Sequence, residues 1–261
     1  MVEHMTSQQP SALVTGATSG IGRATARHLV TDGWRVFAAG RRTENLESLA
    51  QECEELPGAL IPVATDVTND ASIAALFETV ESQGGIDTLL NVAGGAMGAE
   101  PIADADIADW EWMIETNVLG SLRVIQKFLP MLRAHGEATV LNLTSTAGLI
   151  AYEGGAGYNA AKFGQHALTS ALRLEEAEHN IRVIEVLPGL VKTDEFALKR
   201  MRGDESKAAD VYAGVSKPLT AEDVADVCAY AVNLPHHINL DQIVMRPVKQ
   251  AAQHKLIRDA E

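Results

Sequence analysis

Short apolar runs alternate with stretches of helical periodicity along almost the whole chain. The runs are rich in β-branched and aliphatic residues, which predicts strands at 12–14, 35–39, 60–63, 88–90, 139–143, 182–187 and 242–245. Between them, the spacing of apolar positions predicts helices at 21–31, 44–54, 71–81, 109–134, 158–179 and 221–233. Asn69 and Thr220 stand where two of these helices should be capped, and Asp223 would complete a weak capping box with Thr220.

Strands that alternate with helices predict an α/β fold. Right-handed crossovers between successive strands give a parallel sheet whose two faces are both covered by helices. We therefore expect a single-domain, doubly wound Rossmann fold with a seven-stranded parallel sheet. The polar segment at 1–10 has no apolar signal region and is expected to be a flexible tail.

Composition narrows the class of partner. A chain of 261 residues with 46% hydrophobic residues can bury one large core, yet no apolar run approaches the roughly 18 residues that span a bilayer. The net charge of −14 disfavours nucleic acids and anionic membranes as partners. Cys53 and Cys228 lie far apart without a Cys/His cluster, so we expect no disulfide scaffold, no metal site and a cytoplasmic location.

Three glycines follow the first predicted strand in the sequence TGATSGIG at 15–22. Gly16, Gly20 and Gly22 have the spacing G-x-x-x-G-x-G and lead into a predicted helix, whose N-terminal N–H groups and dipole attract phosphate. Gly16 would make the turn, and the other two would let a pyrophosphate and the helix approach closely. The alternative is a tight strand-to-helix turn that binds no ligand.

The end of the second predicted strand bears on the cofactor. Gly40 occupies the position where an acidic residue would bind a free ribose 2′-hydroxyl, and Arg41 and Arg42 follow it. A guanidinium there can bind a 2′-phosphate, which favours NADP and leaves NAD as the alternative. Either arginine could instead start a solvated helix. Asp66, after the third strand, could accept a hydrogen bond from adenine or cap the next helix.

Candidate chemistry lies in the segment LTSTAGLIAYEGGAGYNAAKFG. Tyr158 and Lys162 are four residues apart in a predicted helix, so the ammonium lies beside the phenol. Bringing a phenol from a pKa of about 10 to near 7 requires roughly 4 kcal/mol, which a lysine and a positively charged nicotinamide can supply. Tyr158 could then exchange a proton with an alcohol or carbonyl, and Ser145 could hold the reacting oxygen.

These motifs, in this order, resemble the short-chain dehydrogenases/reductases. The resemblance covers residues 11–247 and includes TGATSGIG at 15–22, DV at 66–67, NVAG at 91–94, Asn117, Ser145, YNAAK at 158–162 and PGLVKT at 188–193. It implies that Asn117 holds the water of a proton relay through Lys162, which also binds the nicotinamide ribose. Val92 departs from the family's usual NNAG, which affects a structural hydrogen bond and leaves the catalytic set complete.

The resemblance assigns two sets of residues. The catalytic set is Asn117, Ser145, Tyr158 and Lys162. The cofactor-binding set is Gly16, Thr18, Ser19, Gly20, Ile21, Gly22, Arg41, Arg42, Asp66, Val67, Asn91, Ala93, Gly94, Tyr158, Lys162, Pro188, Gly189, Val191 and Thr193.

Three further segments resemble the NADP-dependent 3-hydroxy acid dehydrogenases: GGAMGAEP at 94–101, the stretch 188–212, and INLDQIVMRPVKQ at 238–250. That likeness implies a homotetramer (or a homodimer), with a C-terminal arm at 248–261 that contributes to subunit packing. It also draws attention to Lys199, Arg200 and Arg202, which lie where a lid over the nicotinamide should be. Arg200 could bind a substrate carboxylate, or the three cations could form a solvated face balanced by Asp204 and Glu205.

The sequence therefore predicts an NADP-dependent oxidoreductase that moves a hydride between the nicotinamide and a small hydroxy or carbonyl compound. A 3-hydroxy acid or its semialdehyde is the expected substrate, bound by Ser145, Tyr158 and Arg200. The alternative within the family is a broad-range aldehyde, ketone or 3-oxoacyl reductase. Outside enzymes, a dinucleotide sensor without turnover and a scaffold protein are further alternatives.

Overall fold

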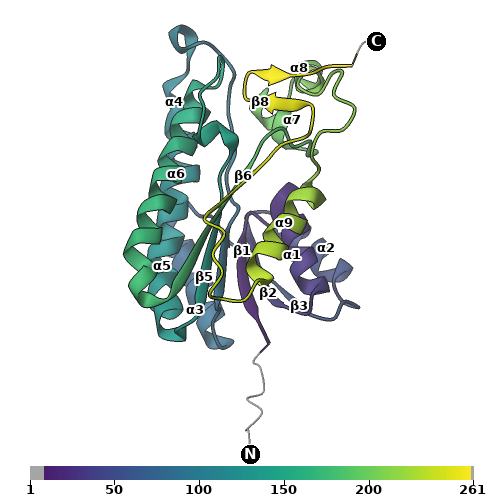
Figure 1. Cartoon of the computed structure of the whole chain (residues 1–261). Helices are drawn as coiled ribbons and strands as arrows, with labels where there is room; N and C mark the ends of the chain where they lie inside the picture. Colours follow the sequence, from purple (N-terminus) through teal and green to yellow (C-terminus); the bar gives the residue numbers. More distant parts are fainter. Residues whose placement is uncertain (1–8, 260–261) are drawn as a thin grey trace, which may run out of the picture.

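Seven parallel strands form one sheet in the order β3-β2-β1-β4-β5-β6-β7, in a computed structural model that describes residues 9–259 (Figure 1). All seven predicted strands are present, each within one residue of its expected ends or matching them. Their bounds are β1 Ser11–Thr15, β2 Arg35–Gly40, β3 Ala59–Ala64, β4 Thr88–Asn91, β5 Ala138–Leu143, β6 Ile181–Pro188 and β7 Gln242–Met245. The doubly wound fold is thereby confirmed.

Helices cover both faces of this sheet (Figure 1). One core cluster joins the sheet to α1, α2 and α9, and a second joins its other face to α3, α5 and α6. The helices are α1 Gly20–Thr31, α2 Thr43–Glu52, α3 Asp70–Ser82, α4 Ile107–Ile114, α5 Gly120–His135, α6 Ala156–Glu176, α7 Phe196–Arg200, α8 Glu205–Asp210 and α9 Ala221–Asn233. Central strands such as β5 and β6 are buried along their whole length, which explains their unbroken apolar runs.

The predicted helix at 109–134 is the least regular element. It consists of α4, a π-helix at Glu115–Leu119, and α5, which follow one another without a break. Apolar periodicity cannot show a π-helix, because one extra residue in a turn shifts the pattern only locally. The irregular turn contains Asn117, whose side chain is fully buried.

Both predicted caps are present. Asn69 accepts a hydrogen bond from the Ser72 N–H at the start of α3. At the start of α9, Thr220 and Asp223 form the reciprocal capping box, with Thr220 Oγ1 accepting from the Asp223 N–H and the Asp223 carboxylate accepting from the Thr220 N–H. Local sequence signals therefore fixed these two helix starts.

Two pieces at the carboxyl ends of the strands were not predicted. The short helices α7 and α8 follow β6, and residues after β7 form a small hairpin of β8 Gln250–Ala252 and β9 Lys255–Leu256 (Figure 1). The hairpin belongs to the segment expected to be an arm. We call residues 194–210, which contain α7 and α8, the lid. The flexible tail predicted at 1–10 lies outside the described residues except for its last two.

Two structural findings bear on membranes and metals, and both apply to the described residues only. None of the helices between residues 9 and 259 is long and apolar enough to cross a bilayer. The same residues contain no group of three or more His, Cys, Asp or Glu side chains arranged to hold a metal ion.

Candidate active site

A cleft of about 1030 Å³ opens at the carboxyl ends of the strands. It lies where β1 and β4 are neighbours and the strand order reverses, which is where doubly wound sheets bind ligands. Small-ligand pockets usually measure roughly 300–1,000 Å³, so this cleft has room for a dinucleotide together with a small substrate. The glycine loop, the ends of five strands, the start of α6, the lid and the C-terminal hairpin all contribute to its lining.

The glycine loop has the shape that a phosphate needs. Gly16 and Gly20 adopt φ values of +72° and +52°, a region that side chains other than glycine rarely enter. A Cβ on Gly22 would lie 2.3 Å from the Gly16 carbonyl oxygen, so the helix can approach the loop only with glycine there. Ser19 stands at the N-cap of α1 but makes no side-chain capping bond, which leaves first-turn N–H groups for a ligand.

The end of β2 is shaped for a cationic contact. A Cβ on Gly40 would lie 2.5 Å from Thr18 Cγ2, so an acidic side chain does not fit there without movement. Arg41 is exposed and lines the cleft. Arg42 turns back over the glycine loop, where its guanidinium donates to Thr18 Oγ1 (3.0 Å) and Ser19 Oγ (2.9 Å). Arg42 is therefore more than the solvated start of a helix.

An acidic residue of the lid completes this cluster. The Glu195 carboxylate accepts from Arg42 at 2.6 Å, from Lys199 at 2.5 Å and from Ser19 Oγ at 3.1 Å. The hydrogen bond from Arg42 is the main reason that the pKa of Glu195 falls to about 2. Glu195 thus joins the lid to the phosphate loop across the mouth of the cleft. Nothing in the local sequence indicates this pair, because its members are 153 residues apart.

Asp66 also lines the cleft, at the end of β3. Its Oδ1 accepts from the Thr68 N–H (3.0 Å) and the Thr68 hydroxyl (2.8 Å) in a local turn. Asn69 is the cap of α3, so the predicted capping role of Asp66 is wrong. Burial opposes the charge, but the two Thr68 bonds and the charge of Arg41 outweigh it and hold the pKa of Asp66 below its usual value. The carboxylate is ionised and its Oδ2 has no hydrogen bond to the described residues.

Ser145, Tyr158 and Lys162 come together at the bottom of the cleft. Ser145 follows β5 and accepts from the Ala147 N–H, which holds its hydroxyl at the strand end. Tyr158 lies in the first turn of α6, and Lys162 follows one turn later with its Nζ 5.8 Å from the centre of the phenol ring. The predicted juxtaposition of phenol and ammonium is therefore present.

Burial dominates the ionisation of this pair. It raises the pKa of Tyr158 above the ordinary phenol value, helped by Tyr152 and opposed by Ser145 and Arg200. It also lowers the pKa of Lys162 to about 7, opposed only by the charge of Glu185. The buried lysine alone therefore does not bring the phenol toward ionisation. A phenolate must gain further stabilisation from what binds in the cleft.

Asn117 lies behind this pair and does not line the cleft. Its side-chain Oδ1 accepts from the Gly95 N–H and its Nδ2 donates to the Gly95 carbonyl. The backbone carbonyl of Asn117 accepts from Ser121 Oγ at 2.8 Å. Ser121 Oγ accepts in turn from Gln165 Nε2, and Gln165 Oε1 accepts from Lys162 Nζ at 2.8 Å. Two buried side chains therefore connect Lys162 to Asn117, the residue that the resemblance linked to it through water.

The remaining predicted cofactor-binding residues, apart from Asn91, line other parts of the cleft. Ala93 and Gly94 line the cleft, as do Ile21, Val67, Pro188, Gly189, Val191 and Thr193. Asn91 does not reach the cleft. It is buried beneath the wall and donates to Asn142 Oδ1, so it supports the strand ends from below.

The three lid cations that the sequence singled out, Lys199, Arg200 and Arg202, make separate contacts. Lys199 pairs with Glu195, and Arg202 pairs with Asp109 at 2.5 Å. The balancing partners are therefore not Asp204 and Glu205, as the solvated-face alternative assumed. Asp204 instead caps α8 and pairs with Lys207.

Arg200 is in a different position from its neighbours. Its guanidinium donates to three neutral oxygens: Gly98 O (3.1 Å), Tyr152 Oη (3.0 Å) and Gly154 O (2.9 Å). It lines the cleft 5.9 Å from the centre of the Tyr158 ring and forms no ion pair with any described carboxylate. Arg200 thus places a positive charge that has no described carboxylate partner beside Tyr158.

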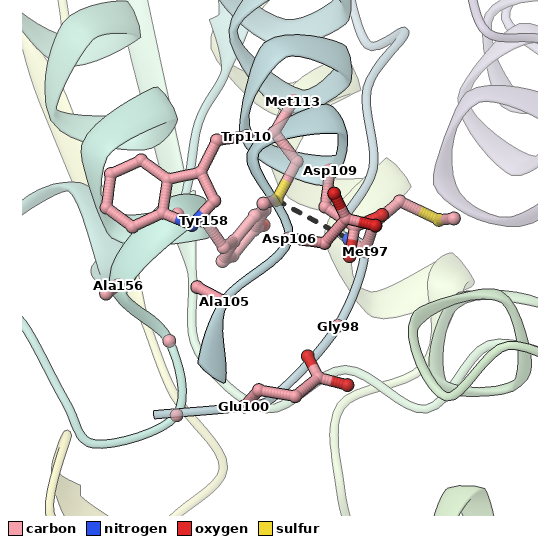
Figure 2. A pocket seen from close by; sticks show the side chains of 13 residues that line it. Met97, Gly98, Glu100, Ala105, Asp106, Asp109, Trp110, Met113, Ala156 and Tyr158 are labelled. Atoms are coloured by element: carbon pink, nitrogen blue, oxygen red, sulfur yellow. Dashed lines mark hydrogen bonds between the residues drawn. The ribbon is translucent and has the colours of Figure 1, made fainter. Parts of the chain in front are cut away.

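A second cavity lies behind Tyr158 and is too small for a substrate (Figure 2). Its volume of about 20 Å³ holds little more than one water molecule. Trp110 and Met113 pack around it, and Met113 Sδ accepts from the Met97 N–H (Figure 2). A substrate must therefore reach Tyr158 from the main cleft.

A glycine phosphate loop at the switch point, with Ser145, Tyr158 and Lys162 at the neighbouring strand ends, defines a dinucleotide-dependent oxidoreductase. The chain belongs to the short chain dehydrogenase family, whose model matches residues 10–202. It is therefore an enzyme of the NAD(P)-dependent dehydrogenase/reductase type, and the non-catalytic alternatives are set aside.

Three similar proteins illustrate the range of the family. An uncharacterised oxidoreductase of Mycobacterium tuberculosis is 46% identical over 241 residues, 92% of each chain. An NADP-dependent 3-hydroxy acid dehydrogenase of Salmonella typhimurium is 37% identical over 92% of this chain and 95% of its own. The closed form of a serine dehydrogenase complexed with NADP⁺ superposes with a TM-score of 0.87 at 34% identity, over 96% of this chain and all of the other.

Proposed function

We propose that this enzyme uses NADP(H) to interconvert a small 3-hydroxy acid and the corresponding carbonyl compound. Arg200 is the observation that carries the substrate assignment, because it places a positive charge without a carboxylate partner beside Tyr158. Two of the similar proteins carry names that refer to NADP, and one of these names a 3-hydroxy acid as substrate.

The cofactor assignment is supported by the two ends of the cleft. The loop of Gly16, Gly20 and Gly22 would hold the pyrophosphate, and Arg41 would bind a 2′-phosphate where Gly40 leaves no carboxylate to repel it. Lys162 would bind the nicotinamide ribose. The bound nicotinamide supplies or accepts the hydride.

The protein's own part in the chemistry is proton transfer. Ser145 holds the reacting oxygen by a hydrogen bond, and Tyr158 gives that oxygen a proton on reduction or takes one on oxidation. The Lys162 ammonium favours the phenolate, and Gln165 holds this ammonium in place. Asn117 bonds Gly95, which follows β4, and Ser121, which leads through Gln165 to Lys162. It therefore holds this part of the cleft wall and the Lys162 ammonium at a fixed distance.

The assembly and location follow from the resemblance. We propose a cytoplasmic homotetramer, or a homodimer, with the catalytic domain at 11–247 and an arm at 248–261. Within one protomer the hairpin of this arm lies against the cleft, where Gln250 Oε1 accepts from the Leu190 N–H at 2.8 Å. An arm that packs a neighbouring subunit would thereby also contact the cofactor site.

Replacement of Arg41 by alanine tests the cofactor assignment. The variant should lose a charge-assisted contact of roughly 1.5–3 kcal/mol, which is about one to two decades in the preference for NADPH over NADH. Values of kcat/KM for both cofactors measure this preference. Arg27→Ala, an exposed change elsewhere in the nucleotide-binding half, should leave it unchanged. Equal use of the two cofactors by the unmodified enzyme contradicts the assignment.

Tyr158→Phe tests the proton-transfer role. We expect a loss of turnover on the order of 10²–10⁴-fold, because no hydroxyl remains to exchange a proton with the substrate. Binding of NADPH, followed by fluorescence, should stay nearly intact, whereas Lys162→Met should weaken both turnover and binding. Tyr230→Phe, on an exposed tyrosine of α9, is the matched control. Normal turnover by Tyr158→Phe would show that another group transfers the proton.

Arg200→Ala tests the substrate class. Loss of the carboxylate contact should lower kcat/KM for 3-hydroxy acids by about 2 kcal/mol, roughly thirtyfold, and spare neutral alcohols of similar size. Arg202→Ala perturbs the lid without removing the charge beside Tyr158, so it should affect acids and neutral alcohols alike. If Arg200→Ala also lowers kcat/KM equally for 3-hydroxy acids and neutral alcohols, Arg200 only supports the lid. If the unmodified enzyme ignores 3-hydroxy acids, it is a broad-range carbonyl reductase instead.

A further inference from the structure

One carboxylate near the catalytic residues has no part in the mechanism described so far. Glu185 lies in the middle of β6 and is completely buried. A carboxylate in such a place is costly unless its oxygens are well satisfied. Its partners are Thr144 Oγ1 at 2.7 Å, His166 Nδ1 at 2.9 Å and 3.0 Å, and Gln242 Nε2 at 3.3 Å.

The position of these partners relates Glu185 to the active site. Thr144 stands between Leu143, whose carbonyl accepts from Lys162 Nζ, and Ser145. His166 follows Lys162 by four residues, as Lys162 follows Tyr158. Residues at this spacing share one face of a helix, so α6 presents Tyr158, Lys162 and His166 in consecutive turns towards the strand ends.

The charges that face Glu185 are few. From α6 the ammonium of Lys162 and the titratable imidazole of His166 face Glu185, whereas the contacts from β5 and β7 are the neutral side chains of Thr144 and Gln242. Arg173 and Asp241, nearer the amino end of β6, pair with each other. Lys162 is only 4% exposed, so the nearby negative charge acts on it through a poorly screening interior.

We propose that Glu185 is a positioning residue for catalysis, whose buried negative charge keeps the Lys162 ammonium protonated beside Tyr158. His166 and Thr144 satisfy the carboxylate so that it can stay charged inside the protein. The proposal rests on the catalytic roles proposed for Tyr158 and Lys162. The direction of the effect on Lys162 follows from the charges. Burial lowers the pKa of Lys162 to about 7, whereas the negative charge of Glu185 raises it.

Glu185→Gln is the first test, since it removes the charge and keeps the shape. Without the carboxylate, the ammonium of Lys162 should lose its proton at lower pH. The alkaline limb of the kcat/KM profile should therefore move to lower pH, with a loss on the order of tenfold at about pH 8–9 and little loss at about pH 6; tenfold corresponds to one pKa unit. Glu185→Asp retains the charge and is the matched control.

His166 supplies a second variant that leaves the buried carboxylate in place. Its side chain is 25% exposed, so the longer chain of His166→Arg can reach solvent. A permanent positive charge at this position would cancel that of Glu185, and the alkaline limb should again move to lower pH. His166→Gln keeps an N–H donor without adding a charge, and should not move the limb in that direction. This pair of variants decides the question if Glu185→Gln fails to fold.

A measurement of Lys162 protonation that does not depend on enzyme activity separates this inference from the proposed function. The cofactor-free enzyme is labelled with trace acetic anhydride at a series of pH values, and mass spectrometry follows the acetylation of Lys162, which occurs only on the neutral amine. Labelling should begin at lower pH in Glu185→Gln and His166→Arg than in the wild type. Unchanged labelling curves and an unchanged alkaline limb would overturn the inference. A shifted labelling curve with an unchanged limb supports the effect of Glu185 and counts against the catalytic role of Lys162.

Discussion

The active site depends on burying an ammonium and a phenol together at the carboxyl ends of the strands. Neither group keeps its ordinary ionisation there, because burial lowers the pKa of Lys162 and raises that of Tyr158. The protein therefore holds a lysine that can be charged at neutral pH next to a phenol that resists ionisation. A further positive charge in the cleft would stabilise the phenolate, which is what the proposed oxidation of an alcohol requires.

Much of the surrounding structure serves to make this burial tolerable. The chain from Lys162 through Gln165 and Ser121 ends at Asn117, in a π-helix that interrupts a helix packed against α6. Within this arrangement the Lys162 ammonium donates to Gln165 Oε1 and to the Leu143 carbonyl, which hold it near Tyr158. Buried networks of this kind specify one geometry, since every group has a defined partner. Among the described residues, Glu185 is the carboxylate whose charge raises the pKa of Lys162 against the effect of burial.

The lid reaches both the glycine loop and the surroundings of Tyr158. Glu195 reaches the phosphate loop through Arg42 and Ser19, whereas Arg200 reaches the neighbourhood of Tyr158. Glu195 is the N-cap of α7 and Arg200 is its last residue, so one short helix makes both contacts. A lid held to the nucleotide loop at one end thus positions the proposed carboxylate-binding residue at the other. A movement of α7 would therefore change the contact with Arg42 and the position of Arg200 beside Tyr158 together.

The sequence predicted the strands, the glycine loop and the Tyr158–Lys162 pair because each depends on local pattern. Seven apolar runs formed the sheet, and spacing of four residues put phenol and ammonium on one helix face. Local pattern could not show the π-helix at 115–119, the short lid helices, or the partner of Arg42, which lies 153 residues away. Nor did it show that burial would raise the pKa of Tyr158, since burial depends on what packs from other elements. Polar residues at 165 and 166, on the same helix as Lys162, were the available signal for the buried network.

The central claim is that Tyr158 becomes an effective acid–base group only when the oxidised cofactor is bound beside Lys162. The phenolate absorbance of the wild type minus that of Tyr158→Phe isolates the ionisation of this tyrosine among the four in the chain. Titrated with pH, this difference should rise only above the ordinary phenol range in the cofactor-free enzyme, and at distinctly lower pH with NADP⁺ bound. An ionisation of Tyr158 that is the same with and without NADP⁺ would contradict the account.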